Sequence, residues 1–159
     1  MKKLLRALLA LTLVLSLPVM AWAETKTTTV EFKVEPAYTV TIPATVTLDK
    51  VTDTGDYAKT ETITAENVRL LEGQQVQVKL TGSFKLKTAA DATYELPYTV
   101  KVDGSATPIS SGDVVATFGT STEKQTSTLS FEAENPQYAG DYSDQVTFTI
   151  EVVSQPAQP

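Results

Sequence analysis

Apolar and polar residues alternate along several stretches of this chain. From Val30 to Leu48 nearly every even-numbered residue is apolar, whereas the odd-numbered residues are mostly Thr, Glu and Lys. The alternation returns around Val78, from Tyr94 to Val102, and around Phe148. Successive side chains point to opposite faces only in a β-strand. The pattern therefore predicts strands with one buried face and one exposed face.

Turn residues divide the chain into about nine short strands. No stretch has the spacing of an amphipathic helix, and residues 67–71 are ambiguous. Thr81 and Gly82 indicate a hairpin between two of the strands. The expected fold is all-β, an immunoglobulin-like two-sheet antiparallel β-sandwich. The strands are expected near residues 27–35, 38–42, 44–49, 60–64, 74–80, 83–88, 93–102, 113–118, 125–133 and 145–153.

The first 23 residues have the pattern of a secretory signal peptide. Three basic residues precede an apolar run from Ala7 to Met20, and the small residues Ala21 and Ala23 follow. The run is shorter than the roughly 20 residues of a spanning helix, so we expect cleavage after Ala23. The predicted organisation is a signal peptide at 1–23, a β-sandwich at 24–153 and a flexible tail at 154–159. The protein is then secreted, extracellular or at the cell surface, or periplasmic where an outer membrane exists.

Composition excludes several functional classes. Removing residues 1–23 leaves 10 basic and 19 acidic residues, a formal charge of −9, which argues against nucleic acid and anionic membranes as partners. The sequence has no His and no Cys. It therefore lacks Cys-His and Ser-His-Asp catalysis and nearly every zinc or copper site. We predict a protein that is not an enzyme and has no cofactor, catalytic residue or metal ligand.

Acidic residues gather in two predicted loops. Asp53-Thr54-Gly55 matches the triplet of aspartic proteases, but its polar surroundings favour an ordinary turn. Neither loop has EF-hand spacing, and solvated acids are the favoured interpretation over calcium ligands. The oxygen ligands available to calcium would be Asp49, Asp53 and Asp56 in one loop, and Glu134, Asp141 and Asp144 in the other.

Two tyrosines in predicted loops are candidate ligand contacts. Tyr57 and Tyr138 fall outside the expected strands and would be the platforms of a sugar-binding surface. Packing of both rings over the ends of the sheets is the favoured alternative.

The stretch from Tyr138 to Ile150 is the most specific in the sequence. Gly140 and Tyr142 just before a strong strand resemble the tyrosine corner of immunoglobulin-like sandwiches, in which the hydroxyl binds backbone. Residues 139–150 also resemble the closing segment of bacterial fimbrial and spore-coat-U-like domains. This resemblance implies a non-catalytic surface or appendage component, adhesin-like or pilin-like, that contacts other surface proteins or copies of itself. An extracellular carbohydrate-binding module is the alternative.

The start of the mature chain raises a question of assembly. Residues 24–35 carry Val30, Phe32 and Val34 on one face. Such a segment either completes its own sandwich, which is the favoured interpretation, or adds to the open edge of a neighbour, as donor strands do in fimbriae. At the other end of the chain, Phe148 is expected in the core, with Thr147 and Thr149 on the opposite face.

Overall fold

The structure is a computed structural model that describes residues 28–88 and 93–155. The chain divides into two units, Met1–Lys33 and Val34–Pro159. Of the first unit only residues 28–33 are described, so the predicted signal peptide and its cleavage site lie outside the described residues. In the described part of the chain no helix is long and apolar enough to cross a membrane.

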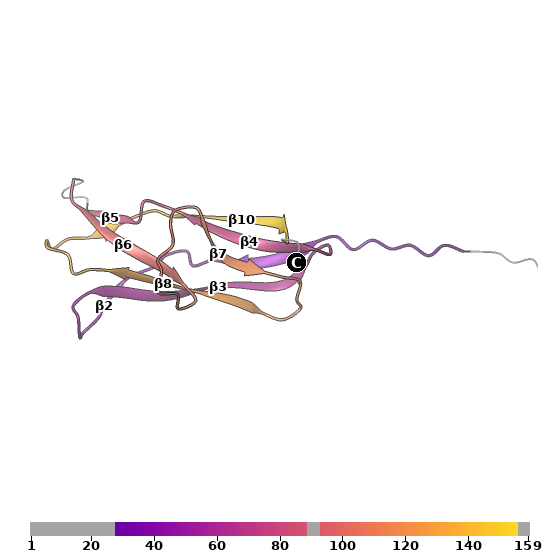
Figure 1. Ribbon diagram of the computed structural model, residues 1–159, viewed down its shortest axis with the longest axis horizontal. Coiled ribbons are helices and arrows are strands. Elements are labelled where there is room, and N and C mark those ends of the chain that lie inside the picture. The colour runs from indigo at the N-terminus through magenta and orange to yellow at the C-terminus, as the bar shows by residue number, and fades with distance from the viewer. Residues whose placement is uncertain (1–27, 89–92, 156–159) are drawn as a thin grey trace, which may run out of the picture. The chain divides into compact units, whose positions relative to one another are not determined.

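The second unit consists of strands, and it confirms the predicted all-β fold (Figure 1). The described residues form ten strands in two antiparallel sheets. The strands are β1 (Ala37–Thr41), β2 (Asp49–Lys50), β3 (Tyr57–Arg69), β4 (Gln74–Thr81), β5 (Lys85–Thr88), β6 (Glu95–Val102), β7 (Asp113–Phe118), β8 (Gln125–Ala133), β9 (Tyr142–Ser143) and β10 (Thr147–Ser154).

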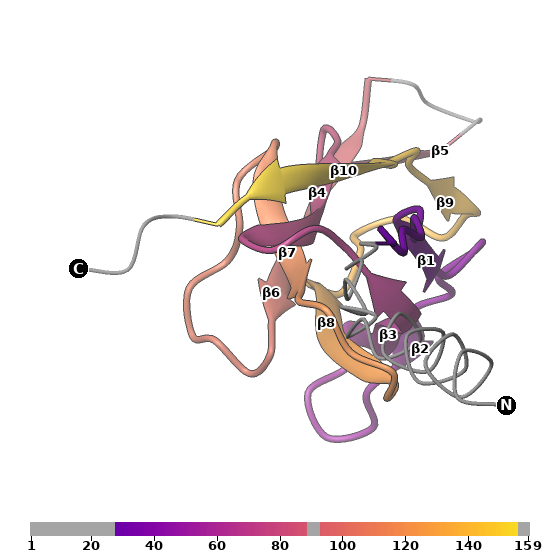
Figure 2. The same cartoon turned by 90° about the vertical axis from the view of Figure 1, so that its right-hand side faces the viewer.

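The two sheets differ in size. The larger has the order β1-β3-β8-β6-β5-β9, with β2 paired to β3, and the smaller has the order β10-β4-β7 (Figure 2). A single core lies between them, and Phe118, Ile63, Leu80 and Leu129 are its largest fully buried side chains. Two sheets closing on one core make the sandwich that the alternation predicted.

Two β-bulges change the parity of the core residues. In β3 the pairing with β1 shifts by one residue near Asn67, whose φ is 52°, so Val68 follows Ala65 into the core. In β7 the pairing with β4 shifts near Val115, which becomes buried next to Ala116. A bulge inserts one unpaired residue and moves the following side chains to the other face. Of the ambiguous residues 67–71, the first three are thus the bulged end of β3, which is far longer than the strand predicted at 60–64, and the last two follow it.

The predicted hairpin around Thr81 and Gly82 is wrong. β4 and β5 lie in different sheets, because the chain crosses from one sheet to the other at residues 82–84. A Cβ atom on Gly82 would lie 2.7 Å from Cγ1 of Val146, in the connection between β9 and β10. The glycine is needed for this close approach rather than for a turn.

The predicted first strand is also wrong. Residues 28–36 form no strand, and Phe32, expected in the core, is 89% exposed. Only Pro36 separates residue 35 from the start of β1 at Ala37. Of the predicted strand at 44–49, only Asp49 lies in a strand, the two-residue β2. Val46 and Leu48 still pack against the core.

The end of the chain is ordered further than expected. β10 continues to Ser154, and the backbone N–H of Gln155 donates to the carbonyl of Gly73 at 2.7 Å. Residues 156–159 of the predicted tail lie outside the described residues. In β10 the predicted parity holds, since Thr147 and Thr149 are exposed while Phe148 packs against the core and is half-buried.

Replacing Gly82 with Ala should destabilise the domain. The added methyl group would overlap Val146, and overpacking of this kind costs about 1–3 kcal/mol. Gly119→Ala is the matched control, because a Cβ there meets nothing within 4 Å. Urea denaturation would measure both variants, and equal stabilities would show that the two connections do not pack as closely as described.

Phe148→Ala should lower the free energy of unfolding by about 2–3 kcal/mol, less than for a fully buried Phe, because the ring is only half-buried. Thr149→Ala, on the exposed face, should cost less than about 0.5 kcal/mol. Thermal melting monitored by circular dichroism compares the two. Similar losses would mean that the register of β10 is wrong.

Candidate functional site

The free edge of β10 is the most unusual feature of the sandwich. β10 pairs with β4 along its whole length, from Thr147 opposite Thr81 to Ser154 opposite Gln74, and with no other described strand. β1 likewise ends the larger sheet and pairs only with β3. An unpaired strand edge offers a row of backbone N–H and C=O groups to another chain.

The side chains of β10 show that the core is incompletely covered along this edge. Ile150 and Val152 lie directly opposite Val78 and Val76 of β4, on the same face of the sheet. Val78 and Val76 are fully buried, whereas Ile150 is 36% exposed and Val152 is 38% exposed. The core-facing side chains are therefore fully buried on β4 but partly exposed on its neighbour β10.

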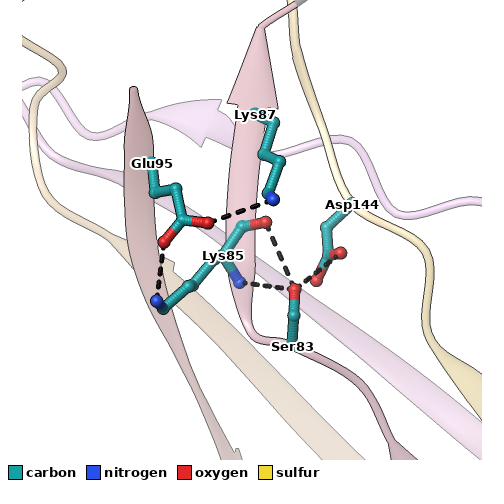
Figure 3. Close-up of polar contacts among 5 residues, drawn as sticks. All are labelled: Ser83, Lys85, Lys87, Glu95 and Asp144. Carbon is teal, nitrogen blue, oxygen red and sulfur yellow. Dashed lines mark hydrogen bonds and ion pairs between the residues drawn. The ribbon is translucent and has the colours of Figure 1, made fainter. Parts of the chain in front are cut away.

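Asp144 fixes the position at which β10 begins. Its carboxylate accepts a hydrogen bond from the Ser83 hydroxyl at 2.9 Å (Figure 3). It also accepts one from the Tyr98 hydroxyl at 3.0 Å. Ser83 belongs to the crossing from β4 to β5, and Asp144 to the connection from β9 to β10. Partial burial, followed by the bond to Asp144, raises the pKa of Tyr98 above its ordinary value of 10.0. Through Asp144, the β4–β5 connection and the β9–β10 connection are both linked to Tyr98 of β6.

A second polar group ties β5 to β6. Glu95 pairs with Lys85 at 2.6 Å and with Lys87 at 3.0 Å (Figure 3). Hydrogen bonds from these two ammonium groups lower the pKa of Glu95. The pairs are exposed, so they add little stability and mainly align the two strands.

The structure does not bring the two candidate ligand tyrosines together in one pocket. Tyr57 is half-buried at the start of β3 and lines a cavity of about 510 Å³ with residues that include Tyr98 and Glu132. Tyr138 is 56% exposed, and its ring packs edge-to-face on Tyr94 with centroids 5.1 Å apart. Tyr138 does not line the cavity of Tyr57. A ligand role for either residue stays a prediction.

Tyr142 lies beside the same aromatic pair. Its hydroxyl donates to the backbone carbonyl of Tyr138 at 2.8 Å, and its ring lies 6.0 Å from that of Tyr94. Desolvation, with smaller effects of Tyr94 and Tyr138, raises the pKa of Tyr142. The hydroxyl therefore closes the loop that leads into β9.

The acidic loop residues have other partners. Asp49 pairs with Lys59 at 2.8 Å, and Asp56 accepts from the backbone N–H of Asn135 at 3.3 Å. Asp144 accepts the two hydroxyl hydrogen bonds described above. Among residues 28–88 and 93–155, no three metal-ligating side chains gather. Asp53 lies in a turn closed by a bond from the Gly55 N–H to the Val51 carbonyl, as expected from the sequence.

Sequence reasoning did not find the open edge. Ile150 and Val152 have the same alternation as buried strands, and nothing in that pattern says whether a second neighbour is present. The one available signal was their position in the last strand, after which no further strand is predicted. Ser83 and Asp144 carried no recognisable motif, because their contact joins residues 61 positions apart.

Two solved structures that are similar to this sandwich come from fimbrial complexes. One is from the chaperone–tip adhesin complex of CFA/I fimbriae, with 19% identity and a TM-score of 0.51, covering 76% of this chain and 42% of that chain. Another is from the CsuC–CsuE chaperone–tip adhesion subunit pre-assembly complex of archaic chaperone-usher Csu pili of Acinetobacter baumannii, with 19% identity and a TM-score of 0.54. It covers 74% of this chain and 40% of that chain.

This chain thus spans about two fifths of the length of each chain that it matches, and at this identity the likeness concerns the fold alone. The predicted resemblance to bacterial fimbrial β-sandwich domains is confirmed at that level. No protein-family model and no curated protein matches the sequence.

Tyr142→Phe should lower the free energy of unfolding slightly, because it removes one hydrogen bond to backbone. Tyr57→Phe is the matched control, since no hydrogen bond of the Tyr57 hydroxyl is described. Urea denaturation compares the two variants. An unchanged Tyr142→Phe would mean that the hydroxyl does not hold the loop.

Proposed function

We propose that this protein is a non-catalytic subunit of a bacterial surface fibre or adhesin assembly, joined to neighbouring subunits by β-strand addition. The observation that carries the proposal is the pair formed by an open edge and a strand-like segment in one chain. Among the described strands β10 pairs with β4 alone, and residues 28–36 have strand alternation but form no strand. Main-chain hydrogen bonds and alternate side chains are the means by which an added strand binds an edge.

The exposed side chains of the segment support an intermolecular role. Val30 is 88% exposed, Phe32 is 89% exposed and Val34 is 45% exposed, all on one face of an extended chain. A row of apolar side chains with this spacing suits the half-covered row of Ile150 and Val152. Residues 28–36 form no strand in the structure, so in this proposal the strand comes from a second molecule. Donation here takes the place of the self-completion expected from the sequence.

The comparisons support the same class of function. Both matched structures are complexes of a chaperone with a fimbrial or pilus tip subunit. For this chain the proposal therefore gives protein partners, a secreted or surface location and no catalytic activity. The glycan-binding alternative lacks a specific observation, because Tyr57 and Tyr138 do not form a common pocket.

The proposal predicts concentration-dependent oligomers of the mature protein, beginning at Glu24. Analytical ultracentrifugation over a range of concentrations measures them. Deleting residues 24–35 should abolish the oligomers, and the shortened domain should bind a synthetic peptide of that sequence. Ile150→Asp, which places a charge on the open margin, should weaken the binding by about tenfold or more. A full-length protein that is monomeric at every concentration would contradict unaided strand donation.

A further inference from the structure

We propose that charged residues select one register for the added strand, in which Lys33 of one copy lies opposite Glu151 of a second copy. This inference rests on the proposed strand addition and names the occupant of the open edge as a second copy of this chain. The relevant charges are Glu31, Lys33 and Glu35 on the segment, and Glu151 on β10.

The direction of the added strand follows from the sheet that it would join. All neighbours in the order β10-β4-β7 are antiparallel. Antiparallel pairs are slightly more stable than parallel pairs, and purely antiparallel sheets are over-represented. The added strand therefore runs antiparallel to β10.

The parity of side chains then limits the possible registers. Even-numbered residues of β10 face the core row, because Ile150 and Val152 lie opposite the buried Val78 and Val76. On the segment the even-numbered residues are the apolar ones. A shift by one residue would turn the apolar face of the segment to solvent, so the allowed registers differ by two residues.

Charge separates these registers. With Lys33 opposite Glu151, opposite charges face each other on the outer face of the sheet. A shift by two residues in one direction places Glu31 opposite Glu151, and a shift in the other direction places Glu35 there. Like charges directly opposite each other destabilise a strand pair. Glu151 also contacts Lys79 of β4, so its carboxylate would lie between two ammonium groups.

The apolar residues favour the same register. With Lys33 opposite Glu151, Val34 faces Ile150 and Phe32 faces Val152, so the two most exposed core-row residues of β10 are both covered. The next register without a charge clash places Thr29 opposite Glu151 and leaves only Thr28 to cover Val152. Charge and burial therefore agree on one alignment.

The absence of cysteine makes a direct test possible, because introduced cysteines are the only ones present. Full mature chains carrying Glu35→Cys are mixed with differently tagged chains carrying a single cysteine at position 145, 147, 149 or 153. Directly opposite residues lie within the Cα range of a disulfide. The proposed register predicts the highest yield with Thr149→Cys. Thr147→Cys reports the register with Glu31 opposite Glu151, and Gln145→Cys reports the one with Thr29 there. Val153→Cys reports a parallel strand.

A charge reversal tests the selecting interaction. Adding Lys33→Glu to the Glu35→Cys donor should lower the yield at position 149 by about five-fold or more. An acceptor with Lys79→Glu and Glu151→Lys keeps its own ion pair in reversed form, and should restore the yield. Circular dichroism and thermal melting of each variant show that its sandwich remains folded.

The outcomes separate the two proposals. Preferred cross-linking at position 149, lost and restored by the charge reversals, supports the register. A preference for position 145, 147 or 153, or equal yields at all four, would overturn the register while leaving strand addition in place. Folded variants without a cross-link at any position, together with a mature protein that is monomeric at every concentration, would overturn the second copy as occupant, and with it the proposed function.

Discussion

The edge of β10 offers backbone groups with which no second described strand of the sandwich pairs. Residues 28–36 have strand alternation but form no strand, and only Pro36 separates residue 35 from the start of β1 at Ala37. Phe32 in this segment is 89% exposed, and Ile150 on the edge of β10 is 36% exposed. The unpaired backbone of this edge is the constraint from which the proposed strand addition follows.

The open edge is nevertheless held in place by the rest of the fold. The strands β4 and β10 pair in the smaller sheet, and their continuations β5 and β9 pair in the larger sheet. Both chains bend together where Gly82 meets Val146, and Asp144 binds Ser83 and Tyr98 at the same place. β10 thus has a defined position before any second molecule arrives. Preorganisation of this kind lowers the ordering cost of binding.

Much of the fold was predictable from the sequence because alternation depends only on local geometry. The strands near 74–80, 93–102, 113–118, 125–133 and 145–153 were found, and so was the even parity of β6. The failures came from contacts between distant residues. From the sequence alone, a glycine in a turn cannot be distinguished from one that allows the close approach of Val146. The alternation around Phe32 is likewise the same in a core strand and in an exposed segment.

The candidate site was predictable in one half only. The apolar face of residues 28–35 and its possible donation to a neighbour could be inferred from their spacing. The receiving edge could not, because pairing is a property of the whole sheet and not of the strand concerned. Tyr142 was recognisable from its position before the last strand, whereas the tie between Ser83 and Asp144 needed the three-dimensional structure.

The position of β10 as the last strand gives the proposed assembly an order in time. A chain is synthesised from its N-terminus, so residues 28–35 emerge before Thr147–Ser154. A growing chain thus possesses the proposed donor segment long before it has the proposed receiving edge.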